Sequence, residues 1–206
     1  MKRGRLIVIA APSGAGKTSL VKALLAGEPR LRLSISHTTR TRRPTEVEGR
    51  EYHFVSKPEF QELVKRGEFL EHAQVFDNHY GTARAFVEAQ LAAGHDVLLE
   101  IDWQGAQQVR RAMPECVSIF VLPPARQTLA ERLARRATDT SAVIRRRLQD
   151  AAGDMSHYNE FDYVVVNDDF ARAVGDLKRI IEGTGADLKG DRPDLEPLLK
   201  ELLAPA

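Results

Sequence analysis

Five short apolar runs, rich in β-branched residues, alternate along the chain with segments whose apolar residues have helical spacing. The runs are Leu6 to Ala10, Leu31 to Ile35, Val97 to Ile101, Val117 to Leu122 and Tyr163 to Val166. Most of them are nearly continuous in Val, Ile and Leu, which is typical of strands that are buried on both faces. Helices between such strands imply right-handed crossovers. The pattern therefore predicts an α/β fold, a three-layer sandwich in which helices cover both faces of a five-stranded parallel sheet.

Capping and stop signals predict the ends of two helices. Ser56-Lys57-Pro58-Glu59 has the form of a capping box, in which the serine and glutamate side chains satisfy backbone N–H groups at a helix start. The helix that follows is expected to end at Gly67. Another helix is expected to begin near Thr82 and to end at Gly94.

Two segments are longer than the connections of a simple sheet require. Residues 36–96 separate the second and third predicted strands, and their polar start and aromatic content indicate an inserted subdomain. From Ala125 to Tyr158 a further helical segment is dense in arginine. The tail, from Asp187 to Ala206, contains one amphipathic helix behind a polar linker, and the sequence leaves open whether that helix packs on the fold.

Composition narrows the expected location and partners. The 206 residues, 43% of them hydrophobic, suffice for one compact domain. Lys and Arg together number 30 and Asp and Glu 29, so the net charge is +1 and we expect neither nucleic acid nor a membrane as a partner. The single Cys116 excludes an internal disulfide, and no apolar run approaches the roughly 18 residues of a membrane span. We therefore expect a cytoplasmic protein.

The strongest chemical signal follows the first predicted strand directly. Ala11-Pro12-Ser13-Gly14-Ala15-Gly16-Lys17-Thr18-Ser19 leads from that strand into a helical pattern. In a phosphate-binding loop the glycines let backbone N–H groups turn towards phosphate oxygens, and the helix start adds partial positive charge. Lys17 would reach the β- and γ-phosphates of a nucleotide, and the Thr18 hydroxyl would ligate Mg²⁺. Ala11 stands where the consensus loop has glycine, and a chance glycine turn is the alternative.

Further motifs follow along the chain. They are Ser36-His37-Thr38-Thr39-Arg40-Thr41-Arg42-Arg43-Pro44, Tyr80-Gly81-Thr82, Asp102-Trp103-Gln104-Gly105 and Val166-Asn167-Asp168-Asp169. Together with the phosphate loop, this series resembles the bacterial guanylate kinases from about residue 4 to about residue 182. The resemblance is specific because independent motifs keep their order over most of the chain.

The resemblance implies a kinase made of one domain, residues 1–206, in three parts. The core would comprise about residues 1–34, 91–124 and 159–206, with a GMP-binding part at about 35–90 and a helical lid at about 125–158. The enzyme would transfer the γ-phosphoryl group of ATP to GMP, and to dGMP, in purine nucleotide metabolism, with Mg²⁺ as its cofactor. It would be a monomer or a small homo-oligomer.

Roles for individual residues follow from the resemblance, position by position. The phosphate of GMP would be held by Arg40, Arg43 and Tyr52, with Tyr80 beside it. The guanine would be faced by Ser36, Glu71, Thr82 and Asp102, with Glu100 nearby. The phosphates of ATP would lie on residues 11–19, with Asn167 near the adenine. The catalytic cations would be Lys17, Arg40 and Arg43 together with the lid residues Arg132, Arg136 and Arg147.

The hydrogen-bonding pattern of guanine independently suits two of these side chains. Guanine has donors at N1 and N2, so the carboxylates of Glu71 and Asp102 match that edge, and a hydroxyl matches its O6 acceptor. Adenine has an acceptor at N1, which a buried carboxylate would repel. A site of this kind can reject the mismatched base by roughly 10⁴.

Two positions depart from the family pattern. Many members have Asp where this chain has Glu100, and glycine where it has Ala137, which removes the residue best suited to a positive φ angle. We therefore expect altered hydrogen bonding at Glu100 and altered lid geometry at Ala137.

Three alternative functions are compatible with parts of the sequence. A kinase for ribose bisphosphate would share the phosphate loop, but Glu71, Thr82 and Asp102 favour a base-binding pocket. A non-catalytic guanylate-kinase-like interaction module is disfavoured by Lys17-Thr18. A GTPase or an RNA-associated protein is disfavoured because the chain has no Asn-Lys-x-Asp motif, although the arginine-rich segment could form solvated helices or an RNA-binding face.

Overall fold

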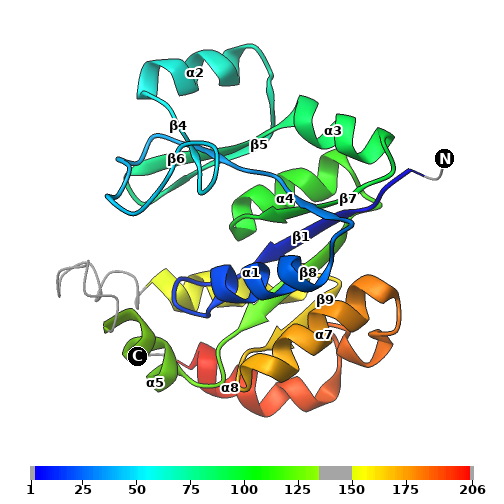
Figure 1. Cartoon of the computed structure of the whole chain (residues 1–206). Coiled ribbons are helices and arrows are strands. Elements are labelled where there is room, and N and C mark those ends of the chain that lie inside the picture. Colours follow the sequence, from blue (N-terminus) through cyan, green and yellow to red (C-terminus); the bar gives the residue numbers. More distant parts are fainter. Residues whose placement is uncertain (1–2, 135–149, 205–206) are drawn as a thin grey trace. The chain divides into compact units, whose positions relative to one another are not determined.

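The computed structural model describes residues 3–134 and 150–204 (Figure 1). Its labelled helices are α1 (Lys17–Gly27), α2 (Lys57–Lys65), α3 (Arg84–Ala92), α4 (Trp103–Ala112), α5 (Arg126–Ala134), α7 (Phe170–Glu182) and α8 (Glu196–Leu203). Residues 150–156 are also helical. Short 3₁₀ helices are η1 (His157–Glu160), η2 (Ala186–Leu188) and η3 (Pro193–Leu195). The strands are β1 (Leu6–Ala10), β2 (Leu31–Leu33), β3 (His37–Thr38), β4 (His53–Phe54), β5 (Phe69–Val75), β6 (Asn78–Ala83), β7 (Asp96–Glu100), β8 (Val117–Leu122) and β9 (Tyr163–Val166).

The larger sheet is parallel and has the strand order β2-β7-β1-β8-β9. Leu31 of β2 lies opposite Asp96 of β7, and Ile119 of β8 lies opposite Tyr163 of β9. Every residue of β1 is buried, as is every residue of β8 after Val117. The predicted α/β fold with a five-stranded parallel sheet is thus confirmed, and burial explains why these strands are almost entirely Val, Ile and Leu.

Three strand boundaries differ from the predicted runs, one of them the end of β7, which lies at Glu100 rather than at Ile101. β2 ends at Leu33 rather than at Ile35, although the Ser34 N–H still donates to the Leu98 carbonyl at 3.0 Å. β7 begins at Asp96, one residue before the apolar run, because Asp96 lies opposite Leu31 in the ladder. Backbone pairing rather than side-chain polarity therefore decides the start of β7.

The smaller sheet has the order β4-β3-β6-β5 and is built entirely from residues between His37 and Ala83. β5 and β6 form an antiparallel hairpin in which Glu71 lies opposite Thr82. The turn of the hairpin contains Phe76 with a φ angle of 54°. This hairpin brings two of the predicted guanine-binding residues face to face.

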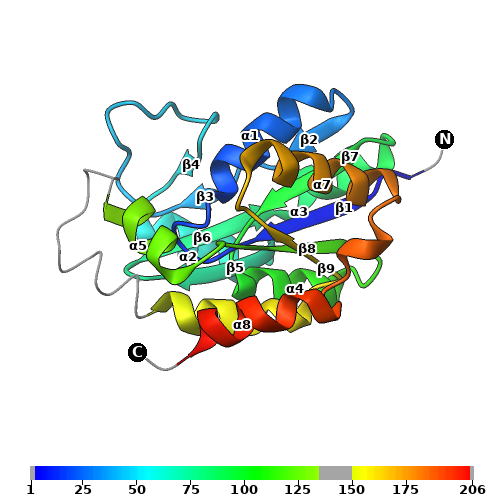
Figure 2. The same cartoon turned by 90° about the horizontal axis from the view of Figure 1, so that it is seen from below.

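The chain divides into two compact units, Met1–Val8 with Glu28–Val117 and Ile9–Gly27 with Ser118–Ala206. In the first unit α3 packs on β7 and β5, and α4 packs on β5. In the second unit α1 packs on α7, and α7 packs on β9 (Figure 2). The division into core, GMP-binding part and lid stays a prediction.

The capping box at Ser56 is confirmed. The Glu59 N–H donates to Ser56 Oγ at 3.3 Å, and the Ser56 N–H donates to Glu59 Oε2 at 2.7 Å. α2 ends at Lys65, and Gly67 follows with a φ angle of 68°. α3 begins at Arg84 rather than near Thr82, because Thr82 and Ala83 are still paired with β5.

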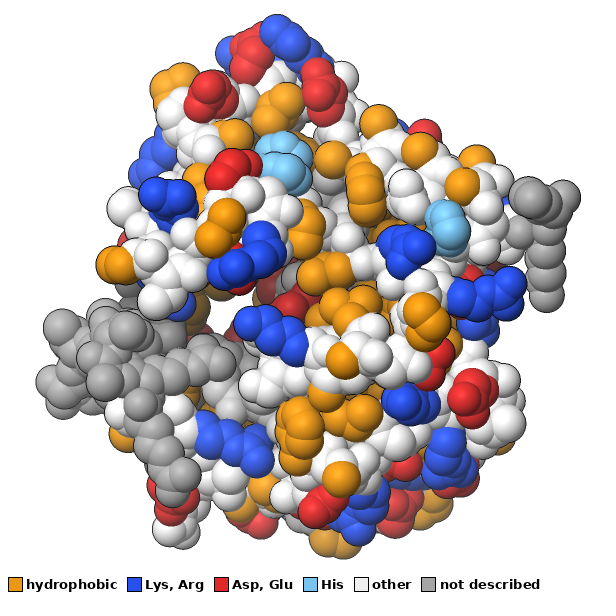
Figure 3. All heavy atoms as spheres, viewed as in Figure 1, with side chains coloured by type: hydrophobic (Ala, Val, Ile, Leu, Met, Phe, Trp, Pro, Cys, Tyr) orange, Lys and Arg blue, Asp and Glu red, His pale blue; other side chains and the backbone are white. Residues whose placement is uncertain are grey.

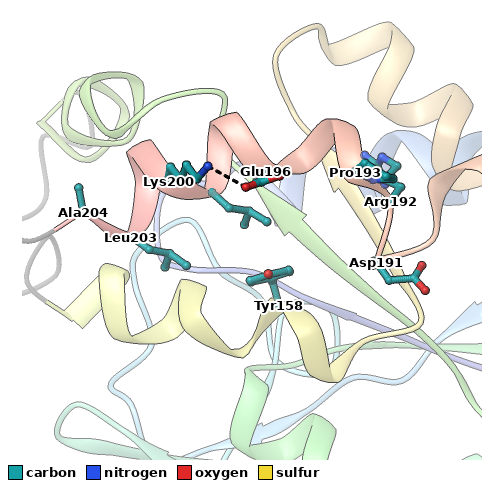
Figure 4. A pocket seen from close by; sticks show the side chains of 10 residues that line it. Tyr158, Asp191, Arg192, Pro193, Glu196, Lys200, Leu203 and Ala204 are labelled. Atoms are coloured by element: carbon teal, nitrogen blue, oxygen red, sulfur yellow. Dashed lines mark ion pairs between the residues drawn. The ribbon is translucent and has the colours of Figure 1, made fainter.

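The tail helix packs on the second unit. Leu195 and Leu202 are buried, and the Arg192 guanidinium donates to the Val164 carbonyl at 2.7 Å. Figure 4 shows α8 running beside the helix at residues 150–156, with Tyr158 between them. A groove of about 530 Å³ remains there, lined partly by Arg192 and Lys200. Both cations form ion pairs with tail carboxylates, so the groove is a poor candidate for binding an anionic substrate.

The surface has no dominant charge on the face shown in Figure 3, where Lys and Arg side chains are interspersed with Asp and Glu. This mixture agrees with the net charge of +1. In the described part of the chain no helix is long and apolar enough to cross a membrane.

Candidate active site

The phosphate loop, in the second unit, connects β1 directly to α1. Gly14 and Gly16 have φ angles of 93° and 95°, in the left-handed region that favours glycine. The Ala15 N–H donates to the Pro12 carbonyl at 3.2 Å, and the Ser19 N–H donates to the Gly16 carbonyl at 3.1 Å. The loop therefore turns tightly and passes straight into the first turn of the helix.

Close packing around the loop also requires both glycines. A Cβ at Gly16 would overlap Nδ2 of Asn167. A Cβ at Gly14 would lie 3.0 Å from side-chain atoms of Leu129 and Leu133 on α5. Neither position has room for alanine unless its neighbours move.

Asn167 and Arg132 are both brought to the loop. Asn167 follows β9 and donates through Nδ2 to the Ala15 carbonyl at 2.7 Å. Arg132, on α5, donates to the same carbonyl at 3.2 Å and to the Asn167 carbonyl at 3.0 Å. Arg132 thus contacts the loop, whereas Arg136, Arg147 and the departure at Ala137 lie outside the described residues.

The start of α1 presents the predicted ATP-binding side chains. Lys17 is the first helical residue and is half-buried, while Thr18 and Ser19 are exposed. The first backbone N–H groups of a helix have no partner within the helix, so they form a site of partial positive charge. The geometry suits an anion that also meets the Lys17 ammonium group.

In the first unit, a buried carboxylate and a buried hydroxyl face each other across the β5–β6 hairpin. Glu71 is 3% exposed and Thr82 is fully buried. Thr82 Oγ1 donates to Glu71 Oε1 at 2.5 Å. A carboxylate has further acceptor capacity beyond one bond, so Glu71 can accept from a ligand while it stays held by Thr82.

The start of α4 brings Asp102 towards Glu71. Asp102 is the N-cap, and its Oδ1 accepts from the Gly105 N–H at 2.7 Å. A Cβ at Gly105 would overlap Oε2 of Glu71 and would lie 3.4 Å from Asp102 Oδ1. Gly105 therefore leaves the space in which the two carboxylates converge, and the helix start favours their negative charge.

Gln108 ties α4 to the exposed edge of β5. Its Oε1 accepts from the His72 N–H at 3.1 Å, and its Nε2 donates to the His72 carbonyl at 2.7 Å. The side-chain amide thus pairs with the strand as a neighbouring strand would. Because His72 follows Glu71, this pairing sets the position of Glu71 relative to α4.

Arg40 lies among aromatic rings beside Glu46. Arg40 Nη2 is 2.6 Å from Glu46 Oε1, and the guanidinium carbon lies 5.3 Å from the ring centroid of Tyr52. Burial lowers the pKa of Arg40, but the hydrogen bond to Glu46 outweighs that effect and the net pKa is raised. A guanidinium has five N–H donors, so Arg40 retains donors for a phosphate.

Tyr52 and Tyr80 lie close together, with ring centroids 5.8 Å apart. Burial, then the neighbouring Tyr80 and Glu100, raise the pKa of Tyr52 to about 12. The phenol therefore keeps its proton at neutral pH and can donate a hydrogen bond to an anion. Glu100 is half-buried at the end of β7 and contributes its charge to this region.

Two further residues predicted to bind GMP, Arg43 and Ser36, lie in the same segment as Arg40. The Arg43 backbone N–H donates to Glu46 Oε2 at 2.8 Å, and the Arg43 side chain is exposed. Ser36 is half-buried, and its carbonyl accepts from the His53 N–H at 2.9 Å. Ser36 precedes Arg40 and Arg43 follows it, so the three residues belong to one continuous segment. A ligand at Arg40 therefore lies within reach of this segment.

Comparison with known proteins assigns the chain to a family. Residues 3–184 match the family model described as guanylate kinase. The chain belongs to the guanylate kinase family. It is 55% identical over 203 residues to a guanylate kinase of Methylococcus capsulatus, covering 98% of this chain and 100% of that protein. It is 54% identical over 200 residues to a guanylate kinase of Alkalilimnicola ehrlichii, covering 97% of this chain and 98% of that protein. The crystal structure of a guanylate kinase from Anaplasma phagocytophilum has a TM-score of 0.73 at 35% identity, covering 97% of this chain and 95% of that chain.

The resemblance to guanylate kinases seen in the sequence is thereby confirmed, while the roles of single residues stay predictions. Sequence reasoning missed Gly105, Gln108 and Glu46 as supports of the site. The sequence held one signal for Gly105. Glycine has a low helix propensity, so its presence in the first turn of a helix indicates that a side chain there would lack space. Nothing in the sequence marked Gln108, since its partner His72 is 36 residues away.

Proposed function

We propose that this member of the guanylate kinase family transfers the γ-phosphoryl group of ATP to GMP, giving ADP and GDP. The observation that supports the choice of acceptor most directly is the buried Glu71–Thr82 pair beside Asp102. The N–H donors at N1 and N2 of guanine fit this set of acceptors.

The ATP phosphates are proposed to lie on residues 11–19. Backbone N–H groups of the loop and of the first turn of α1 would bind the phosphate oxygens, and Lys17 would neutralise charge on the β- and γ-phosphates. This role is supported by the positive φ angles of Gly14 and Gly16, which turn the loop around an anion.

Magnesium is proposed as the cofactor, with Thr18 as its protein ligand. No group of three or more His, Cys, Asp or Glu side chains that could hold a metal occurs within residues 3–134 and 150–204. An exposed hydroxyl beside the phosphate loop fits Mg²⁺, which usually takes most of its oxygen ligands from phosphates and water. When bound, Mg²⁺ neutralises charge on the phosphate oxygens of ATP.

The phosphate of GMP is proposed to bind Arg40 and Arg43, with Tyr52 and Tyr80 as hydrogen-bond donors. The Glu46 carboxylate holds the Arg40 guanidinium in place before the ligand arrives, which lowers the cost of ordering it. The guanine base is proposed to face Ser36, Glu71, Thr82 and Asp102, with Glu100 nearby. Adenine would meet carboxylates at its N1 acceptor and would be rejected.

The chemical step needs no general base. The second pKa of a phosphate monoester is about 6, so the GMP phosphate is largely dianionic at neutral pH. One of its oxygens attacks the γ-phosphorus of ATP, and the bond from that phosphorus to the β–γ bridging oxygen breaks as ADP leaves. Lys17, Arg40 and Arg43, together with Arg132, Arg136 and Arg147, are proposed to neutralise the repulsion between the two anions.

The cellular setting is likewise a proposal. The buried Cys116 is the single cysteine of the chain, which suits a reducing compartment, and we propose the cytoplasm. We propose a monomer or a small homo-oligomer without nucleic-acid or membrane partners, acting in purine nucleotide metabolism. Phosphorylation of dGMP is expected too, because none of the residues assigned to guanine depends on the 2′-hydroxyl.

A coupled ADP-release assay with ATP and Mg²⁺ tests the proposal. Acceptors would be GMP, dGMP, AMP, UMP, CMP and ribose bisphosphate. We expect turnover with GMP and dGMP and at least about 10³-fold lower efficiency with AMP. Turnover of ribose bisphosphate but not of GMP would favour the sugar kinase. GMP binding without ADP release would favour an interaction module.

A further inference from the structure

The Ala15 carbonyl of the phosphate loop is held from a distant part of the chain. Asn167 Nδ2 donates to it at 2.7 Å, and the two residues are separated by 152 positions. Asn167 is 4% exposed and Ala15 is fully buried, so the bond is shielded from water. A shielded hydrogen bond is stronger than an exposed one and costs more to break.

Asn167 is itself anchored at both of its backbone polar groups. Its N–H donates to the Leu122 carbonyl at 2.9 Å, which continues the pairing of β9 with β8 beyond Val166. Its carbonyl accepts from Arg132 at 3.0 Å. The end of the sheet therefore gives the Asn167 side chain a defined position from which to hold the loop.

Holding a carbonyl also fixes the next N–H group. The peptide bond is planar and trans, so the Ala15 C=O and the Gly16 N–H point in opposite directions. Because the carbonyl points at Asn167, the Gly16 N–H must point to the other side of the loop. In a phosphate loop, successive N–H groups turn inward around phosphate oxygens.

We propose that Asn167 is a positioning residue for the donor triphosphate, because it orients the Ala15–Gly16 peptide so that the Gly16 N–H faces a phosphate oxygen. This inference rests on the proposed binding of ATP at the loop. It differs from the role near adenine that the family resemblance implies. The packing agrees with it, since a Cβ at Gly16 would overlap Nδ2 of Asn167, which leaves no gap between this amide and the loop backbone.

Asn167→Asp tests the proposal with almost no change of shape. The carboxylate puts an oxygen where Nδ2 donates now, and that oxygen repels the Ala15 carbonyl. The probes are ATP and inorganic tripolyphosphate, each with Mg²⁺, titrated by calorimetry. We expect both affinities to fall by a similar factor of about tenfold or more, while the affinity for GMP stays within about twofold.

Asn159→Asp is the matched control. Asn159 lies exposed in η1 of the same unit, so the same chemical change there should leave all three affinities unaltered. Asn167→Ala is the second variant, because it removes the bond from Nδ2 without adding repulsion and leaves the Ala15 carbonyl with the longer bond from Arg132. It should weaken ATP and tripolyphosphate together by a smaller factor, and it keeps the comparison possible if the Asp variant does not fold in a thermal melt.

The tripolyphosphate measurement separates the two roles. Loss of ATP affinity with unchanged tripolyphosphate affinity would mean that Asn167 contacts adenine, and the proposal would be overturned. Unchanged affinity for both probes would overturn it as well. Failure of the proposed function is a different result, because it appears as wild-type protein that binds tripolyphosphate and yet releases no ADP with GMP.

Discussion

The phosphate loop presents mainly backbone groups, whereas the candidate guanine-binding residues present side chains. The loop is one continuous segment in the second unit, and backbone N–H groups and glycine φ angles define it. The candidate guanine-binding residues Glu71, Thr82 and Asp102 belong to the first unit and are side chains from β5, from β6 and from the start of α4. We expect a site made of backbone groups to accept Ala11 in place of the consensus glycine, and a site made of side chains to depend on each supporting contact.

This difference predicts that substitutions in the two regions separate ATP binding from GMP binding. The largest expected effect is that of Lys17→Ala, which removes the cation at the donor phosphates. Turnover should fall by about 10²-fold to 10³-fold, while the affinity for GMP is retained. Steady-state kinetics and GMP calorimetry would measure both, with Lys22→Ala on the exposed face of α1 as the control. Equal losses of GMP and ATP binding would contradict the assignment.

Glu71→Gln should produce the opposite separation. The amide group would direct N–H donors at the donor edge of guanine and leave a buried mismatch, so kcat/KM for GMP should fall by about 100-fold. The affinity for ATP should stay within about twofold. Glu62→Gln, at an exposed position on α2, is the matched control. Unaltered GMP kinetics would remove Glu71 from the site.

Gly105→Ala tests whether the carboxylate cluster needs its space. The new Cβ would overlap Oε2 of Glu71, so that carboxylate must shift, and KM for GMP should rise by about tenfold. Helix propensity alone would make the variant more stable by up to about 1 kcal/mol. Gly175→Ala in α7 is the control, because a Cβ there meets nothing within 4 Å, and it should gain stability without any change in KM. A tighter or unchanged KM in Gly105→Ala would show that the space is not required.

Gln108→Ala should have a smaller effect in the same direction. Loss of the two bonds to His72 loosens β5 against α4, so KM for GMP should rise by about threefold to fivefold while KM for ATP is constant. Gln61→Ala, exposed on α2, is the control. A rise in KM for both substrates would point to general destabilisation instead.

The smallest effect concerns the Arg40–Glu46 pair and pH. Burial raises the pKa of Glu46, but hydrogen bonds from Arg40 and from the Arg43 N–H outweigh it, so the net pKa is lowered. A lowered pKa in the folded state adds stability above the ordinary value of 4.5, and that stability is lost as the pH falls through the lowered pKa. Wild type should exceed Glu46→Gln by less than about 1 kcal/mol at pH 7, and the difference should be smaller at pH 3. Chemical denaturation at both pH values would measure it, and a difference that grows on acidification would contradict the sign.

The two regions also differ in how far the sequence predicted them. The sequence predicted the loop, the strand before it and the helix after it. Apolar runs, glycines and the Lys17-Thr18 pair are signals of local backbone structure. Ladder pairing explains two of the element ends that were predicted wrongly, those at Thr82 and Asp96. On the acceptor side the residue types were predicted from the family resemblance, but their supports were not.

The sequence by itself determined the α/β fold and the phosphate loop, because short-range patterns specify the local backbone conformation. It also determined the membership of the guanylate kinase family, because the family's motifs occur in order along the chain. Only the tertiary structure decided that Asn167 holds Ala15, that Gly105 makes room for Glu71, and that Gln108 pairs with His72. The physical reason is that each of these contacts joins groups on different elements. Their distances and directions are set by the packing of sheet and helices, which no local pattern records.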